Sequence, residues 1–239
     1  MFQSFVRVLP ALFLVLAASA CQSNQPRFVP SPDAELAQLL LELKRLRGGS
    51  LDADLEDRGM RSRENEIARQ LREMTLVHPR HVPTLVANAA VAYEGNDSAG
   101  AQKYLDQALR LQPDHVSATL LRVRIAAEAG NLPYALRKLK EQIQLAPDSL
   151  DLRETRAGVY FLLEDYGSAI EDLDAAERLR EDGEGSWRSE YHRGLIAETL
   201  GDTQTAQDHY FRCRELNPEF EPAERRWYWL ENSEPEPAG

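Results

Sequence analysis

Histidines are the residues of this sequence best suited to metal binding or proton transfer, and there are five: His78, His81, His115, His192 and His209. A helical zinc site needs two histidines on one helix face, as in H-E-x-x-H, or closely spaced cysteine pairs. His78 and His81 are three residues apart, but Pro79 lies between them, and the two cysteines are far away. We therefore expect solvated loop histidines, no metal site and no cofactor.

Other chemical motifs are equally incomplete. The acidic run Asp52–Asp57 would open a calcium loop, but such a loop needs glycine at its sixth position and glutamate at its twelfth. Those positions hold Asp57 and Arg63, so a solvated linker is expected. Cys213 is expected to be an inert, buried thiol. The sequence also has no phosphate-binding glycine loop and no G-x-S-x-G elbow, so we predict no catalytic residues and no enzyme.

Composition sets the broad class of the protein. The chain has 239 residues, of which 43% are hydrophobic, which fits one or two globular domains. Its 39 acidic and 28 basic residues give a net charge of −11. A nucleic-acid partner would require a basic face. We therefore expect no nucleic acid among the partners.

Residues 1–20 have the pattern of a secretory signal. Arg7 gives the segment a positive start, an apolar stretch covers 8–17, and small residues at 18–20 precede Cys21. The apolar stretch is short for a bilayer core of about 30 Å, so a permanent transmembrane helix is the weaker interpretation. The segment therefore predicts export across a membrane.

The small residues before Cys21 resemble the lipobox of bacterial lipoproteins, although Ala18 stands where that family prefers leucine. The resemblance implies that Cys21 is acylated, for instance with palmitate, and becomes the mature N-terminus. The residue after the cysteine is Gln22 rather than aspartate, which resembles the pattern of lipoproteins that are sorted to the outer membrane. Residues 21–32 then form the lipidated cysteine and a flexible tether. The alternative is cleavage by an ordinary signal peptidase and secretion without lipid.

Residues beyond the tether repeat with a regular period. Pro79, Pro113 and Pro147 are 34 residues apart, and Pro218 follows 71 residues later. Three further columns keep the same register: Ala101, Ala135, Ala169 and Ala206; Leu111, Leu145, Leu179 and Leu216; and Asp97, Asn131, Asp165 and Asp202. A fixed period of this length indicates a repeat array.

Each column has a physical role in a helix–turn–helix unit. The Asp/Asn column is expected to cap the second helix of each pair. The alanines are expected inside that helix, where small side chains allow close helix packing, and the leucines near its end are expected to face the core. The prolines follow, because proline ends a helix. Gly130 and Gly201 are expected in the turn within the pair.

A 34-residue unit with these features resembles the tetratricopeptide repeat (TPR). The resemblance implies an all-α fold, a right-handed α-solenoid of helix-turn-helix repeats with no sheet. Residues 82–220 would hold four repeats: 82–115, 116–149, 150–186 and 187–220. The third carries a three-residue insertion, with Glu181 in place of proline, which predicts a looser joint before the fourth.

The flanks of the array extend this pattern. Residues 33–81 are predicted to form a divergent helical pair, with helices over 33–47 and 64–77 and an acidic loop around 48–58. Leu36, Leu39, Leu40 and Leu43 share one face of its first helix. Residues 221–231 are predicted to be a capping helix that covers the last repeat through Ala223, Trp227 and Leu230. Residues 232–239 are proline-rich and acidic, which favours a disordered tail.

Arginine occupies matching positions in three first helices, at Arg122, Arg156 and Arg193, whereas Asn88 takes that place in the first repeat. One interpretation is a ladder of ion pairs between helices, with carboxylates such as Glu154 and Glu190. The other is a basic strip for an acidic peptide. Guanidinium suits either, since it pairs with carboxylates through a rigid fork.

The TPR resemblance implies that first helices line a concave groove for a protein or peptide partner. The corresponding positions are Val86, Tyr93, Leu120, Arg124, Phe161, Leu162, Tyr191, Leu195 and Glu198. This strip is mainly apolar and aromatic, which suits a peptide with two or three apolar anchors. Some of these side chains, Phe161 above all, have core packing as an alternative role.

The two resemblances together predict a membrane-anchored TPR scaffold in the bacterial cell envelope, facing the periplasm, that assembles or localises an envelope complex. The build is similar to the TPR lipoproteins of type IV pilus assembly. Two alternatives stay open, namely a structural array that binds further copies of itself and a secreted, unlipidated periplasmic adaptor.

Overall fold

The computed structural model describes residues 31–47, 54–180 and 185–232. Within these ranges there are eleven α-helices and no strand. They are α2 (Pro32–Arg47), α3 (Asp54–Val77), α4 (Val82–Glu94), α5 (Ser98–Leu111), α6 (Val116–Glu128), α7 (Leu132–Leu145), α8 (Leu150–Leu162), α9 (Tyr166–Arg178), α10 (Trp187–Thr199), α11 (Thr203–Leu216) and α12 (Glu221–Asn232).

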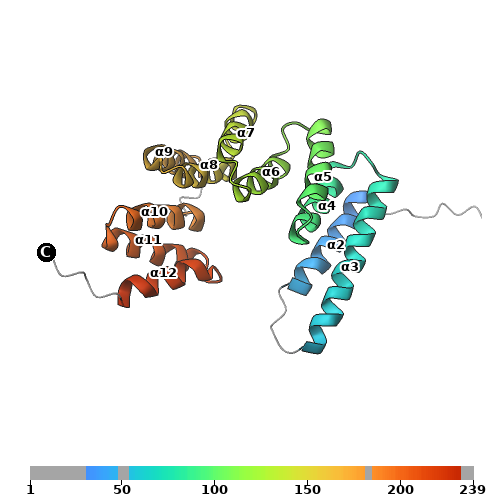
Figure 1. Cartoon of the computed structure of the whole chain (residues 1–239), viewed down its shortest axis with the longest axis horizontal. Coiled ribbons are helices and arrows are strands. Elements are labelled where there is room, and N and C mark those ends of the chain that lie inside the picture. Colours follow the sequence, from blue (N-terminus) through green and yellow to red (C-terminus); the bar gives the residue numbers. More distant parts are fainter. Residues whose placement is uncertain (1–30, 48–53, 181–184, 233–239) are drawn as a thin grey trace, which may run out of the picture.

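The helices stack as antiparallel pairs along an arch that runs from α2–α3 at one end to α12 at the other (Figure 1). Each pair packs against the next, and the first helices α4, α6, α8 and α10 also contact one another in sequence. The core is divided accordingly into five successive clusters rather than one. This confirms the expected all-α solenoid.

Short polar side chains begin the second helix of each of the four repeats. The side-chain oxygen of Asp97 accepts from the backbone N–H of Gly100 at 2.8 Å, and Asp202 accepts from Thr205 at 3.1 Å. Asn131 and Asp165 make the same contact. The predicted caps are therefore confirmed. In the turn before them, Gly130 and Gly201 have φ of 75° and 81°, a backbone region that favours glycine.

The alanine column is buried as predicted, with no exposed surface at Ala101, Ala135, Ala169 or Ala206. The prediction for the leucine column was wrong at three of its four positions, since Leu111, Leu145 and Leu216 are 38%, 59% and 41% exposed. The fourth, Leu179, is half-buried at the end of α9. The three exposed leucines end their helices. The chain turns away there into a proline-containing loop, which leaves these last side chains partly open to solvent.

The arginine column forms ion pairs between helices. Arg122 pairs with Asp106 of α5, and Arg193 lies 2.6 Å from Asp174 and 3.1 Å from Glu177 of α9. Arg156 holds both carboxylate oxygens of Asp172, at 2.5 and 2.6 Å. A ladder was therefore the correct interpretation, but with partners other than Glu154 and Glu190.

Asn88 takes over the role of the arginine in the first repeat. It is 4% exposed, and its side-chain amide donates to the backbone oxygens of Leu71 and Thr84 and to Thr75 Oγ1, at 2.8–3.1 Å. These bonds attach α4 to α3 without a charge. A buried amide with its hydrogens satisfied costs less desolvation than a buried cation.

The N-terminal pair differs from the prediction at two points. Helix α3 begins at Asp54 rather than at Glu64, so residues 54–58 of the expected acidic loop are helical. The sequence 54–63 contains no proline, which would end or kink a helix, so the helix can begin ten residues earlier than predicted. Leu40 is 41% exposed and lies outside the cluster that Leu36, Leu39 and Leu43 form with α3.

The predicted capping helix is present as α12, which packs against α11. Ala223 is fully buried, Leu230 is 6% exposed, and Trp227 packs against the last core cluster. Arg226 adds an ion pair with Glu198 of α10 at 2.7 Å. The helix therefore covers apolar surface that the fourth repeat would otherwise expose.

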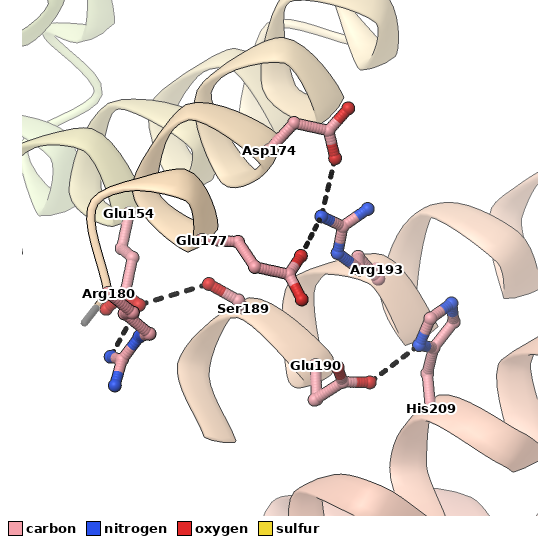
Figure 2. A network of polar contacts seen from close by, with 8 residues as sticks. All are labelled: Glu154, Asp174, Glu177, Arg180, Ser189, Glu190, Arg193 and His209. Carbon is pink, nitrogen blue, oxygen red and sulfur yellow. Dashed lines mark hydrogen bonds and ion pairs between the residues drawn. The ribbon is translucent and has the colours of Figure 1, made fainter. Parts of the chain in front are cut away.

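Polar contacts surround the junction between the third and fourth repeats (Figure 2). The side chain of Glu154, 3% exposed, accepts from Ser189 Oγ at 3.0 Å and lies 3.5 Å from Arg180 Nη2. Ile196 of α10 joins the core cluster of α8 and α9. The predicted insertion falls partly on 181–184, outside the described residues, so the looser joint stays a prediction.

Candidate functional site

A hollow of about 690 Å³ lies against α6, α8 and α10, and we call it the central groove. Its floor is one stripe of α8, formed by Asp151, Thr155, Gly158, Val159 and Leu162. Asp151, Thr155, Gly158 and Leu162 are spaced three or four positions from one to the next, so they share one helix face, and Val159 lies beside Gly158. The groove therefore follows the length of α8, on the side where the first helices meet.

Apolar side chains and two ion pairs line the central groove. Leu120 comes from α6, Leu162 from α8 and Leu195 from α10. Arg188 lies 3.0 Å from Asp151, and Arg124 lies 3.3 Å from Glu128. The four lining charges cancel, so the groove carries no net charge although the chain as a whole is acidic.

The groove brings five of the nine predicted residues together: Leu120, Arg124, Phe161, Leu162 and Leu195. Leu162 is 56% exposed and offers its side chain to a partner. Phe161 has a double role, since it also packs against the core cluster of α8 and α9, with its ring centroid 5.8 Å from that of Tyr166.

Val86 and Tyr93 do not line the central groove. Val86 packs against the core cluster of the first repeat. Tyr93 contacts α6 instead: its hydroxyl donates to the carboxylate of Glu128, and the guanidinium of Arg124 lies 5.2 Å from its ring centroid. Burial and the bond to Glu128 raise the pKa of Tyr93, which keeps its hydroxyl protonated as a donor.

Tyr191 and Glu198 line a different hollow of about 490 Å³ beside α12. The Tyr191 ring packs edge-on against Phe220, with centroids 4.9 Å apart, and joins the last core cluster. Glu198 accepts from the Tyr210 hydroxyl at 2.5 Å and pairs with Arg226. Both side chains thus hold the array's end together, a structural role that the motif alone did not indicate.

His192 and Gly158 belong to the groove but were missing from the predicted strip. Nδ1 of His192 lies 2.9 Å from the backbone oxygen of Arg188, which can only accept, so Nδ1 carries the hydrogen. Nε2 faces Gly158: a Cβ built on that glycine would lie 2.9 Å from it. A glycine within a helical pattern was the signal that could have found this contact.

The environment of His192 favours its neutral form. Burial lowers the pKa of His192, and the charge of Arg188 acts in the same direction, while the Arg188 carbonyl and Glu154 oppose them. The neutral tautomer with hydrogen on Nδ1 has a lone pair on Nε2. Within the described ranges, that atom has no hydrogen-bond partner.

The expected loop position is correct for His78, His81 and His115, but His209, like His192, lies in a helix, and His81 and His115 are partly buried rather than fully solvated. His81 and His115 precede α4 and α6 as cap residues, and His115 Nδ1 accepts from the backbone N–H of Ala118. His209 lies in α11, 2.7 Å from Glu190. Repeat periodicity identifies helices well, but it does not show which polar side chain meets a neighbouring helix.

Cys213 is fully buried, as predicted, and burial followed by the charge of Glu190 raises the pKa of its thiol to about 11. Such a thiol is a poor nucleophile. In the described part of the chain, no three metal-binding side chains converge on one point. Among the helices described, none has the length and apolarity to cross a membrane. The predicted signal 1–20 and Cys21 lie outside the described residues.

Solved structures show what this fold resembles. A tetratricopeptide repeat protein from Parabacteroides merdae matches with a TM-score of 0.62 and 16% identity, over 84% of this chain and 79% of that one. A thermophilic TPR protein from Thermus thermophilus matches at 0.64 and 16%, over 82% and 98%. A chain of the APC/C hetero-tetramer Cut9–Hcn1 matches at 0.63 and 15%, over 83% and 40%.

No protein-family model matches the sequence, and no curated protein does. The likeness is therefore one of structure. The chain has the fold of a TPR solenoid, with an apolar, net-neutral groove on its first helices.

Proposed function

We propose that this protein is a lipid-anchored, non-catalytic TPR scaffold that binds a segment of a partner protein in its central groove. The observation that carries the proposal is the groove itself, a hollow of about 690 Å³ lined mainly by apolar side chains, with lining charges that pair among themselves. Concave, mostly apolar sites with a few placed polar groups are typical binding sites. One structural neighbour comes from a complex, the hetero-tetramer Cut9–Hcn1.

The groove is tested by site-specific photo-crosslinking in cells of the source organism. A photoreactive residue at Leu162, 56% exposed in the groove, should capture a discrete partner protein, and a second change, Leu195→Arg, should abolish the capture. Leu145 of α7, 59% exposed, is the matched control on an outer helix, and a probe there should capture nothing comparable. Capture from Leu145 but not from Leu162 would contradict the groove assignment.

The envelope location is the second part of the proposal. It is supported by the signal-like segment 1–20, by Cys21 after it and by Gln22. An acylated Cys21 would hold the protein at the outer membrane on its periplasmic side, and the solenoid would assemble or localise an envelope complex there. The TPR lipoproteins of type IV pilus assembly have a similar build.

Mass spectrometry of the mature N-terminal peptide tests the anchor. We expect cleavage before Cys21 and a mass increase equal to its acyl groups. Cys21→Ser should release the protein from membranes or leave it unprocessed, with an unchanged helical circular dichroism spectrum, because Cys21 lies outside the repeats. An unmodified Cys21 on a protein found only in the soluble fraction would favour the secreted, unlipidated adaptor instead.

Self-association is the alternative that the surface of α12 favours. Tyr228 and Trp229 are 64% and 60% exposed there, on the last helix of the array. Sedimentation of the full-length protein at several concentrations separates the two functions. A monomer throughout would contradict a self-associating array.

A further inference from the structure

The hollow beside α12 is the second large depression on the first helices, and we call it the C-terminal hollow. Its volume is about 490 Å³. It is lined by Tyr191 and Glu198 of α10 and by Pro222, Arg225, Arg226 and Trp229 of α12. The α12 residues recur at spacings of three and four positions, so one face of the capping helix forms a wall of the hollow.

Helix α10 connects the C-terminal hollow with the central groove. Leu195 lines the central groove, whereas Tyr191 and Glu198, four positions before it and three after it, line the C-terminal hollow. Residues at these spacings share one helix face. Helix α10 contacts α8, is joined to α12 by the ion pair of Glu198 with Arg226, and lies between the two in Figure 1. A segment bound in the central groove can therefore continue over α10 into the C-terminal hollow.

The two hollows differ in charge, since the lining charges of the central groove cancel. In the C-terminal hollow, Nη1 of Arg226 lies 2.8 and 2.7 Å from the two carboxylate oxygens of Glu198. Arg225 is exposed and has no ion pair in the part of the chain that the structure describes, not even with Glu221 one helical turn before it. The described lining residues of this hollow thus carry one unpaired positive charge, on a chain with a net charge of −11.

Aromatic surface lies beside this charge. Trp229, one helical turn after Arg225, is 60% exposed. The Tyr191 ring is held in place by its edge-on contact with Phe220. Aromatic and arginine side chains provide most of the binding energy at protein interfaces, and a guanidinium pairs with a carboxylate through two parallel hydrogen bonds. The C-terminal hollow therefore suits an acidic side chain with an apolar neighbour.

We propose that the partner segment in the central groove extends over α10 and places an aspartate or glutamate in the C-terminal hollow, paired with Arg225 and packed beside Trp229. This inference rests on the proposed function, since it adds to the chemistry of the same segment. Packed helices are 8–10 Å apart, so two hollows on either side of one helix are about 20 Å apart. An extended chain spans that distance in about six residues.

The test uses random twelve-residue peptides displayed on phage and selected against the full-length protein purified in detergent. Synthetic copies of the enriched peptides are titrated against variants by fluorescence polarisation. Arg225→Glu reverses the charge, and its matched control is Arg212→Glu, at an exposed arginine of α11 without an ion pair in the described ranges. Trp229→Ala removes the ring, and its control is Tyr228→Ala, at a neighbouring side chain that is 64% exposed. Leu162→Arg blocks the central groove.

We expect enriched peptides with an acidic residue about six positions from an apolar anchor. Their affinity should fall about tenfold with Arg225→Glu and with Trp229→Ala, and both controls should leave it unchanged. Lysine in place of the acidic residue of the peptide should weaken binding to the wild type and restore binding to Arg225→Glu. Added salt should weaken binding to the wild type more than binding to Arg225→Glu, because it screens the ion pair.

Other patterns of sensitivity separate this inference from the proposed function. Peptides that lose binding with Leu162→Arg but keep it with Arg225→Glu and Trp229→Ala would overturn the inference and leave the proposed function intact. Sensitivity to Arg225→Glu without sensitivity to Leu162→Arg would mean a separate site and would contradict the continuous path. Enrichment of peptides without acidic residues would also overturn the inference, and enrichment of none would count against both proposals.

Two other occupants of the C-terminal hollow are tested with the same protein. Truncation after Asn232 should leave peptide affinity unchanged, and a gain in affinity would assign the hollow to residues 233–239 of the chain itself. Sedimentation of the wild type and of Arg225→Glu should give the same result. A wild-type dimer that dissociates with Arg225→Glu would assign the hollow to a second copy of the chain, and either of these results would overturn the inference.

Discussion

Truncation of the chain after Phe220 should unfold the C-terminal end of the solenoid, at a cost of about 4 kcal/mol in unfolding free energy. The change removes α12 and with it the buried Leu230, the packed Trp227 and the ion pair of Arg226 with Glu198. Full burial of one large apolar side chain contributes about 1.5–3 kcal/mol. Tyr210, fully buried in the intact protein, would lose its cover.

Urea unfolding measures the loss, and amide hydrogen exchange should locate it in α10 and α11. Truncation after Asn232 is the control, because it keeps all of α12, and it should leave stability unchanged. Ending the chain at Phe220 preserves the contact of that ring with Trp187, at 4.6 Å between centroids, so the effect belongs to α12 alone. Equal stability of the two truncated proteins would mean that α12 is no cap.

Arg156→Ala should destabilise the protein by about 3 kcal/mol, because it leaves a buried carboxylate without its partner. Asp172 is 6% exposed and receives both of its close contacts, at 2.5 and 2.6 Å, from this one guanidinium. The same two bonds raise the pKa of Arg156. The cost reflects the desolvated charge that remains on Asp172 rather than the value of the pair itself.

A second variant separates those two contributions. Arg156→Met combined with Asp172→Leu removes both charges and should recover most of the lost stability. Arg124→Ala is the exposed control: its pair with Glu128 lies within one helix and 68% of its side chain is exposed, so stability should hardly change. If Arg156→Ala costs no more than Arg124→Ala in urea unfolding, water must reach Asp172 in the folded protein.

The repeat unit was predictable from the sequence because its rules are local. A cap residue such as Asp97 acts three positions along its own helix, and Ala101 faces the neighbouring helix wherever the period places it. The start of α3 was missed because the acidic run was interpreted as a solvated loop, although the sequence 54–63 contains no proline that would end a helix. The exposure of the leucines at the ends of the second helices depends on the path of the following loop, which the repeat period does not predict.

The partners of long side chains were harder to predict from the sequence. Arg122 reaches back to α5 and Arg156 reaches forward to α9, although both occupy the same column of the repeat. An arginine spans several ångströms, so its partner depends on which neighbour offers a carboxylate. Tyr191 and His192 are adjacent in sequence, yet they line different hollows, one beside α12 and one over α8. Which hollow each side chain lines depends on how α8, α10 and α12 pack together, which the sequence of α10 alone does not show.

The polar junction of Figure 2 has a consequence for cooperativity. In a solenoid each repeat is coupled only to its neighbours, so the weakest interface sets where the array divides into independently melting units. At this junction the polar contacts include the ion pairs of Arg193 with Asp174 and Glu177, whose carboxylate side chains are 45% and 62% exposed, and salt weakens exposed pairs more than it weakens apolar packing. Ionic strength should therefore act on the length of the cooperative unit, and a single transition at low salt would separate into two at high salt.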